Sequence, residues 1–142
     1  MANVHKDFHG ALSYGIEYLH ERSGDEGVRA FFSGLAGTVY RPLVEDLRKR
    51  GLPALREHWQ RIFDLEGGVI AFEMQGDALV LTVHRCPAIA HMREQGYAIA
   101  PNFCEHTRIV NDAICKAAGY AASVEYNQVE GRCVQRFWKA AS

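Results

Sequence analysis

The spacing of apolar residues changes once along the chain. It follows a helical period in the first half and alternates over much of the second half. Up to residue 66, apolar residues recur three or four positions apart, as in amphipathic helices. One predicted helix ends at Ser23-Gly24, and Asp25 caps a second. Pro42 either kinks that helix or begins another, which stops at Gly51. A further helix runs from Pro53 to Gly67.

The second half combines alternating segments with two helical ones. Strands are predicted over residues 69–75 and 78–85, and again over 121–128 and 132–138, each pair forming a hairpin. A short helix begins at Pro87, and a longer one covers residues 103–118. The predicted fold class is α+β, in one domain spanning residues 1–142. N-terminal helices precede a ββ-α-ββ unit that forms one antiparallel sheet of about four strands.

Length and composition then narrow the class of protein. The 142 residues suit one domain, since domains average ~100–200 residues. Hydrophobic residues make up 48% and charged residues 23%, which excludes intrinsic disorder. The net charge of -1 gives no reason to expect nucleic acid or an anionic membrane as a partner. We find no apolar run of about 18 residues and no secretory signal, so we expect a cytoplasmic protein with reduced thiols.

Polar side chains on three predicted strands offer a first candidate surface. If their faces coincide, they form one polar wall, made of Thr82, His84, Ser123, Glu125 and Gln135. The alternative is an ordinary solvated face, which antiparallel sheets commonly have. The sequence leaves both interpretations open.

The helix over residues 103–118 offers a second candidate surface. Cys104, Arg108, Asn111 and Cys115 follow one another at helical spacing beside the apolar stripe. This pattern indicates the wall of a cleft, in which Arg108 could bind a carboxylate. We expect Cys115 to be a core residue. Cys104 lies in the first helical turn and has two possible roles. Either its thiol pKa is lowered and the thiol is reactive, or the side chain is buried in the core.

The remaining cysteines and histidines extend these candidates. Cys86 lies where a strand meets a helix, with His84 two residues before it. His91 and His106 follow on the next two helices, and a histidine near a thiol would activate it. A metal site would combine Cys86, Cys104 and Cys133 with His84 or Glu125. No cofactor follows with certainty, and zinc is the metal that such ligands suit.

Four short segments carry a resemblance to a known family. They are the strings at residues 84–89, 102–106, 125–127 and 131–137. They contain a Cys-Pro after a strand, a Phe-Cys opening a helix and a Gly-x-Cys hairpin. The chain thereby resembles the L-2-amino-thiazoline-4-carboxylic acid hydrolase family of small bacterial proteins. A looser similarity is to the 4-vinyl-reductase-like domain, a small-molecule sensor with a cysteine-rich end that can hold zinc. Gln128 stands where that domain has a cysteine.

The first resemblance implies hydrolysis of a carbon–nitrogen bond, opening a cyclic amidine such as a thiazoline to an N-carbamoyl product. That chemistry requires a nucleophile, an acid and a cation for the substrate carboxylate. Candidate catalytic residues are Cys86, Cys104, His84, His91, His106 and Glu125. Candidate substrate contacts are Arg108, Asn111 and Asn127.

Two other functions remain open. One is a non-catalytic small-molecule-binding or sensor-like module, which needs only an apolar cavity with a few polar groups. The other is a lyase or isomerase on the same scaffold. In each case the expected partner is a small molecule. A homodimer is a further expectation, with Phe137 and Trp138 as candidate contacts.

Overall fold

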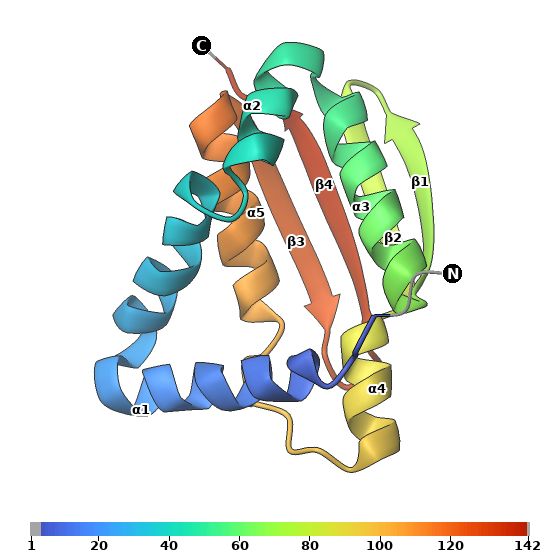
Figure 1. Cartoon of the computed structure of the whole chain (residues 1–142). Coiled ribbons are helices and arrows are strands. Elements are labelled where there is room, and N and C mark those ends of the chain that lie inside the picture. The colour runs from blue at the N-terminus through green and yellow to red at the C-terminus, as the bar shows by residue number, and fades with distance from the viewer. Residues whose placement is uncertain (1–3, 142) are drawn as a thin grey trace.

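The computed structural model describes residues 4–141 and confirms the predicted α+β class. Helices come first and strands follow, as Figure 1 shows. The helices are α1 (Phe8–Gly34), α2 (Arg41–Arg50), α3 (Leu52–Glu66), α4 (Pro87–Gln95) and α5 (Glu105–Ala118), with a short 3-10 turn at Leu35–Gly37. The strands are β1 (Val69–Gln75), β2 (Ala78–Arg85), β3 (Tyr120–Asn127) and β4 (Arg132–Lys139). None of the helices within residues 4–141 is long and apolar enough to cross a membrane.

Glycine at residue 24 bends α1. Two separate helices were predicted here, and the structure instead has one element with a kink. Gly24 has φ 64° and ψ -166°, a backbone conformation that L side chains rarely adopt. The two halves of α1 therefore point in different directions, as the bend in Figure 1 shows. The open question at Pro42 is also answered, because α2 begins there as a new helix.

The sheet has the strand order β1-β2-β4-β3, and each neighbouring pair is antiparallel. One face is covered by helices, which lie in front of the strands in Figure 1. On β2 the residues that reach the core are Leu79, Leu81 and Val83. In the β2–β4 register these three lie opposite Phe137, Gln135 and Cys133. Because paired residues point to the same side, that set of β4 residues also faces the helices.

This register corrects two predictions made from the sequence. Thr82, His84, Ser123 and Glu125 lie on the open face of the sheet, whereas Gln135 points to the helices, so the five do not form one wall. The interpretation as an ordinary solvated face holds for the first four. Phe137 and Trp138 were both proposed as dimer contacts. Phe137 is 0% exposed in the core, and Trp138, 36% exposed, lies on the open face.

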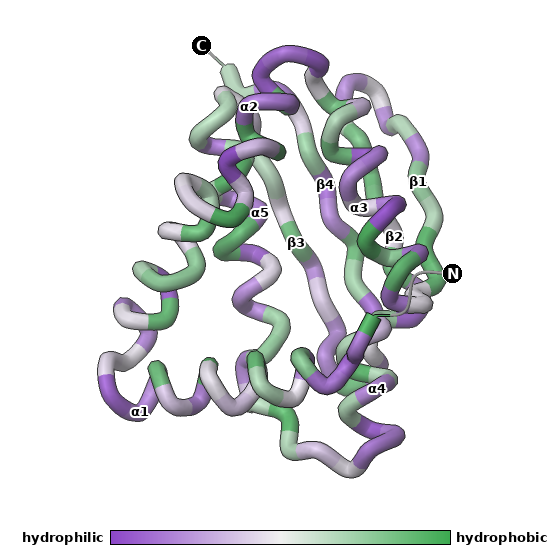
Figure 2. The backbone as a smooth tube through the Cα atoms, in the orientation of Figure 1, coloured by the Kyte–Doolittle hydropathy of each residue, from purple (hydrophilic) through white to green (hydrophobic). Residues whose placement is uncertain are grey.

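The hydrophobic core fills the space between the helices and the covered face. Figure 2 shows hydrophobic and hydrophilic residues interspersed along α1, α3 and α5, and a hydrophilic run where α2 ends. The inward residues of these helices, among them Phe32, Leu47, Leu55 and Ile114, belong to one buried cluster with Leu79, Leu81 and Val83 of β2 and Phe137 of β4. Burial of such side chains supplies most of the folding free energy.

Candidate functional site

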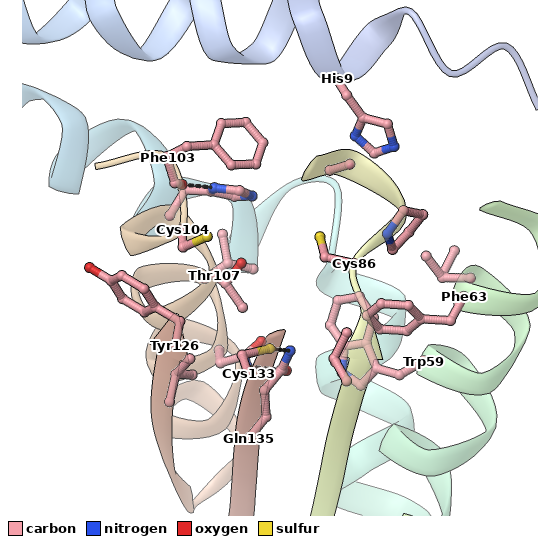
Figure 3. A pocket seen from close by; sticks show the side chains of 18 of the residues that line it. His9, Trp59, Phe63, Cys86, Phe103, Cys104, Thr107, Tyr126, Cys133 and Gln135 are labelled. Atoms are coloured by element: carbon pink, nitrogen blue, oxygen red, sulfur yellow. Dashed lines mark hydrogen bonds between the residues drawn. The ribbon is translucent and has the colours of Figure 1, made fainter. Parts of the chain in front are cut away.

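A cavity of about 340 Å³ lies between the helices and the covered face of the sheet. Its wall is mainly apolar and rich in rings. The aromatic lining residues are Phe8, Phe32, Tyr40, Trp59, Phe63, Phe103 and Tyr126. They come from α1, α3, β3 and the segments that precede α2 and α5. Figure 3 shows several of these rings around the cavity, together with three sulfur atoms.

Three of the four cysteines line this cavity. Cys86 follows β2 and is fixed there by its backbone N–H, which donates to the carbonyl oxygen of Gly131 at 2.8 Å. Cys104 precedes α5, where its N–H donates to Oε1 of Gln128 at 3.0 Å. Cys133 lies on the covered face of β4. Figure 3 places Cys86 across the cavity from Cys104 and Cys133. Cys115 is fully buried and confirms the prediction of a core residue.

Burial keeps the cavity thiols in their neutral form. It raises the pKa of Cys104 to about 12 and that of Cys133 to about 11. It also raises the pKa of Cys86, although the backbone N–H groups of Ala88 and Ile89 partly oppose this. The alternative in which the helix start lowers the pKa of Cys104 is therefore wrong. Loss of hydration of the thiolate is the largest cause of the raised pKa, and the neighbouring thiols of Cys86 and Cys133 add to it.

These cysteines do not assemble a metal site. Among residues 4–141, no group of three or more His, Cys, Asp or Glu side chains is arranged to hold a metal ion. Glu125 and His84, the proposed fourth ligands, lie on the other face of the sheet. The donor set Cys86, Cys104 and Cys133 therefore does not fit zinc, which needs four ligands about 2.0–2.3 Å from one point.

His106 lies in the cavity wall, as predicted, but in a structural setting. Its ring is between those of Phe32 and Phe103, with centroids 5.4 and 4.8 Å away. Nδ1 bonds to the carbonyl oxygen of Phe103, which can only accept, so Nδ1 carries the proton. Burial lowers the pKa of His106. The imidazole is thus neutral, with Nε2 as its acceptor atom.

Asn111 and Gln135 form a buried hydrogen-bonded pair in the wall. Nδ2 of Asn111 donates to Oε1 of Gln135 at 2.8 Å, and Nε2 of Gln135 lies 3.4 Å from Sγ of Cys133. Both side chains line the cavity. Asn111 therefore stays a candidate ligand contact, as the sequence predicted. Its amide nitrogen is already used to satisfy Gln135.

Three predicted site residues lie away from the cavity on the sheet. The carboxylate of Glu125 is exposed and lies 3.2 Å from the guanidinium of Arg136. His84 is exposed on the same open face. Asn127 closes the β3–β4 hairpin, where its Oδ1 accepts from the N–H of Glu130 at 3.1 Å. The structure does not bring these residues to the cysteines, because alternation along each strand sends them to the opposite side.

Arg108 and His91 also lie outside the cavity lining. Arg108 donates to Glu105 at 3.0 Å and to the carbonyl oxygen of Val124 at 3.0 Å, so its guanidinium is occupied by protein groups. His91 lies 2.9 Å from Oδ1 of Asp7 and fastens the start of α1 to α4. The guanidinium of Arg108 therefore does not lie in the cavity, and the prediction that it binds a substrate carboxylate there is wrong. Both side chains stabilise contacts between elements.

Sequence reasoning missed an ionisable pair at the edge of the cavity. Nε2 of His9 lies 3.2 Å from Oε1 of Glu66 without forming a hydrogen bond among the described residues, and both residues line the cavity. His9 comes from the first turn of α1, and Glu66 is the last residue of α3. One signal was present, since His9, Ser13 and Ile16 are spaced for one helix face and all three are buried. Nothing in the sequence indicated the pairing with Glu66.

Comparison with known protein families, with curated proteins and with solved structures gives no match to this chain. The function therefore has to be argued from the cavity itself.

Proposed function

We propose that this protein is a small-molecule-binding module whose ligand occupies the cavity between the helices and the sheet. The main observation behind this proposal is the cavity. Its volume of about 340 Å³ and its lining of aromatic side chains suit a ligand of one or two rings. Pockets for small ligands are typically about 300–1,000 Å³, mostly apolar, and carry a few polar groups that orient the ligand. Here the polar groups include the pairs Asn111–Gln135 and His9–Glu66.

The state of the candidate catalytic groups favours binding over catalysis. An enzyme of the expected type would bring a thiolate, an acid–base group and a carboxylate together. The cavity thiols are protonated, His106 is neutral and bonded to the backbone, and Glu125 is on the far side of the sheet. A binding module requires none of these to be activated.

An unpartnered donor in the wall also supports a bound ligand. Nε1 of Trp59 is buried and has no hydrogen-bond partner in the part of the chain that the structure describes. Trp59 lines the cavity from α3. Buried donors without partners are uncommon in folded proteins, so this nitrogen is a candidate for a partner that the chain itself does not supply.

A matched pair of substitutions tests the proposal. Thr107 lines the cavity from α5, so Thr107→Trp places an indole inside it, whereas Thr82→Trp places one on the open sheet face. With 4-phenylbutan-1-ol as a neutral probe, we expect saturable binding to the wild type in calorimetry. The affinity should fall at least tenfold, equivalent to about 1.4 kcal/mol, in Thr107→Trp and stay unchanged in Thr82→Trp. Absence of saturable binding, or equal affinities in the two variants, would contradict the proposal.

A hydrolase acting on a carbon–nitrogen bond is the second candidate. It is supported by Cys86, whose sulfur faces the backbone N–H groups of Ala88 and Ile89 where α4 begins. Such N–H groups stabilise a thiolate once it forms. In this candidate the thiol of Cys86 or Cys104 gives its proton to Nε2 of His106, and its sulfur bonds to the substrate carbon. The C–N bond at that carbon then breaks as the imidazole returns the proton to the leaving nitrogen, and water hydrolyses the carbon–sulfur bond to release the product.

Thiol chemistry separates the two candidates. Because each pKa unit lowers the thiolate fraction about tenfold, we expect iodoacetamide to alkylate the cavity thiols at pH 7 at least tenfold more slowly than a cysteine peptide. The rates for Cys86, Cys104 and Cys133 can be followed by mass spectrometry of their peptides. Rapid alkylation of Cys86, together with C–N hydrolysis that Cys86→Ala abolishes and Cys115→Ala retains, would establish the hydrolase instead.

The compartment and the assembly state are proposals too. All four cysteines are free, which supports a reducing compartment such as the cytoplasm. The open face of the sheet, where Trp138 is partly exposed, is the surface we propose for a homodimer contact.

A further inference from the structure

The charges around the cavity are unevenly distributed. Among the described lining residues, Glu66 is the only carboxylate and Arg132 is the only lysine or arginine. The side chain of Arg132 is exposed, and its guanidinium lies 3.7 Å from the carboxylate of Glu130, a residue that does not line the cavity. His106 contributes no charge, as shown above. Glu66 is therefore the carboxylate that a ligand in the cavity would meet, with His9 beside it and the Lys6 ammonium near the adjacent Gly67.

Glu66 is held where its charge acts on the cavity. The side chain is 17% exposed, and its Oε1 lies 3.2 Å from Nε2 of His9. Burial is the first cause that raises the pKa values of Tyr40 and Cys86, and the negative charge of Glu66 adds to both. Tyr40 precedes α2 and Cys86 precedes α4, so the carboxylate influences two separate parts of the wall.

Aromatic rings accompany this carboxylate on the same helix. Trp59, Phe63 and Glu66 follow at spacings of four and three residues, so they occupy one face of α3. All three line the cavity, and Figure 3 shows Trp59 and Phe63 directed into it from α3. Aromatic faces attract cations, and a carboxylate provides the counter-charge. An anionic ligand in the same place would be desolvated without a fixed cation to pair with.

From this arrangement we propose that the cavity selects an apolar, ring-bearing amine. Its ammonium group binds the carboxylate of Glu66, and its ring lies among the aromatic side chains of the wall. The inference rests on the proposed binding function and specifies the charge of the ligand. It also replaces the expectation of a carboxylate-bearing ligand, because Arg108 lies outside the cavity lining.

Three probes that share one apolar group test the inference. They are 4-phenylbutylamine, 4-phenylbutan-1-ol and 4-phenylbutanoate, which at pH 7 carry a positive charge, no charge and a negative charge. We expect the amine to bind the wild-type protein at least tenfold more tightly than the alcohol in calorimetry, since charge-assisted hydrogen bonds are the stronger ones. The carboxylate should bind most weakly.

Variants of Glu66 identify the group responsible. Glu66→Gln should remove the preference for the amine, so that the amine binds no more tightly than the alcohol to this variant. Glu66→Asp keeps the charge and should retain a preference for the amine, and Glu73→Gln, on the exposed part of β1, is the matched control. Circular dichroism verifies that each variant is folded. If Glu66→Gln fails to fold, the Glu66→Asp variant and the three wild-type affinities still decide the question.

The outcomes separate this inference from the proposed function. Equal binding of amine and alcohol, or tighter binding of the carboxylate, overturns the inference while the binding function stands. A preference for the amine that Glu66→Gln retains also overturns it, because another group would then recognise the cation. Failure of all three probes to bind counts against both.

Discussion

A Phe137→Ala variant is expected to lose about 3–5 kcal/mol of unfolding free energy. Phe137 is fully buried on the covered face of β4, opposite Leu79 on β2 and Ala122 on β3. Truncating it removes apolar burial and leaves a void that the neighbouring strands can fill only in part. Because domains are stable by only about 5–15 kcal/mol, the loss is a large share of the total. Urea denaturation followed by circular dichroism measures it.

The adjacent residue provides the control for this prediction. Trp138 lies on the open face and is 36% exposed, so Trp138→Ala should cost about 1 kcal/mol. The two substitutions thus distinguish the faces of one strand. Measured on the monomer, equal losses at both positions would contradict the assignment of these two side chains to opposite faces of β4.

Mild acid is expected to destabilise the protein through His58. Its imidazole is half-buried, with its ring 4.6 Å from that of Trp59, and its Nε2 has no hydrogen-bond partner in the described residues. Burial, and next the positive charge of Arg61, lower the pKa of His58 to about 4 from an unfolded value of 6.5. Below pH 6.5 the unfolded chain binds a proton that the folded protein excludes. Stability should therefore fall between pH 6.5 and about 4, and be fully present above that range.

The size of this effect follows from the shift and from solvent exposure. A change from 6.5 to about 4 would correspond to about 3 kcal/mol in a fully buried group. Screening by solvent at this half-buried site reduces the expectation to about 1–2 kcal/mol. Urea titrations at pH 7 and pH 4.5 measure the difference, which His58→Gln should reduce. The same substitution at exposed His84 is the control for losing an imidazole as such. An unchanged pH dependence in His58→Gln would refute the assignment.

Most of the secondary structure was predictable because its signals are local. The turn at Gly76-Asp77 and the glycine at 131, which has φ 69°, separate alternating segments, and both hairpins form there. Glycines and prolines likewise mark most of the helix boundaries. The kink at Gly24 is the exception. A glycine with φ above zero ends many helices, and only packing of both halves of α1 decides that the chain continues as one bent element.

The faces of the sheet were not predictable, since they depend on pairing between distant segments. Alternation along β4 places Gln135 on the opposite side of the strand from Val134 and Arg136. Only the register with β2 decides which of the two sides faces the helices. The same reason explains why Glu125 and His84 were expected in the site and lie outside it. A strand pattern fixes which residues share a side, and the fold selects the side that is covered.

The candidate site was predictable in its cysteines and not in its charges. Cys86, Cys104 and Cys133 were selected at the junctions of predicted elements, and all three line the cavity. Their pKa values were beyond sequence reasoning, because burial depends on the completed fold. His9 and Glu66 are 57 residues apart in the sequence and lie on two helices. No local sequence pattern predicts a contact of this kind.

The cavity wall combines residues from the first helix and the last strand, and this affects when the cavity can form during biosynthesis. Phe8 and His9 contribute from the start of α1, whereas Cys133 and Gln135 contribute from the last strand. β2 pairs with β1 on one edge and with β4 on the other, so the second edge stays unpaired until β4 has been synthesised. During translation the rings of α1 and α3 therefore lack part of their partners until β4 has left the ribosome. Chaperones that shield apolar segments have their main opportunity to act on this protein in that interval.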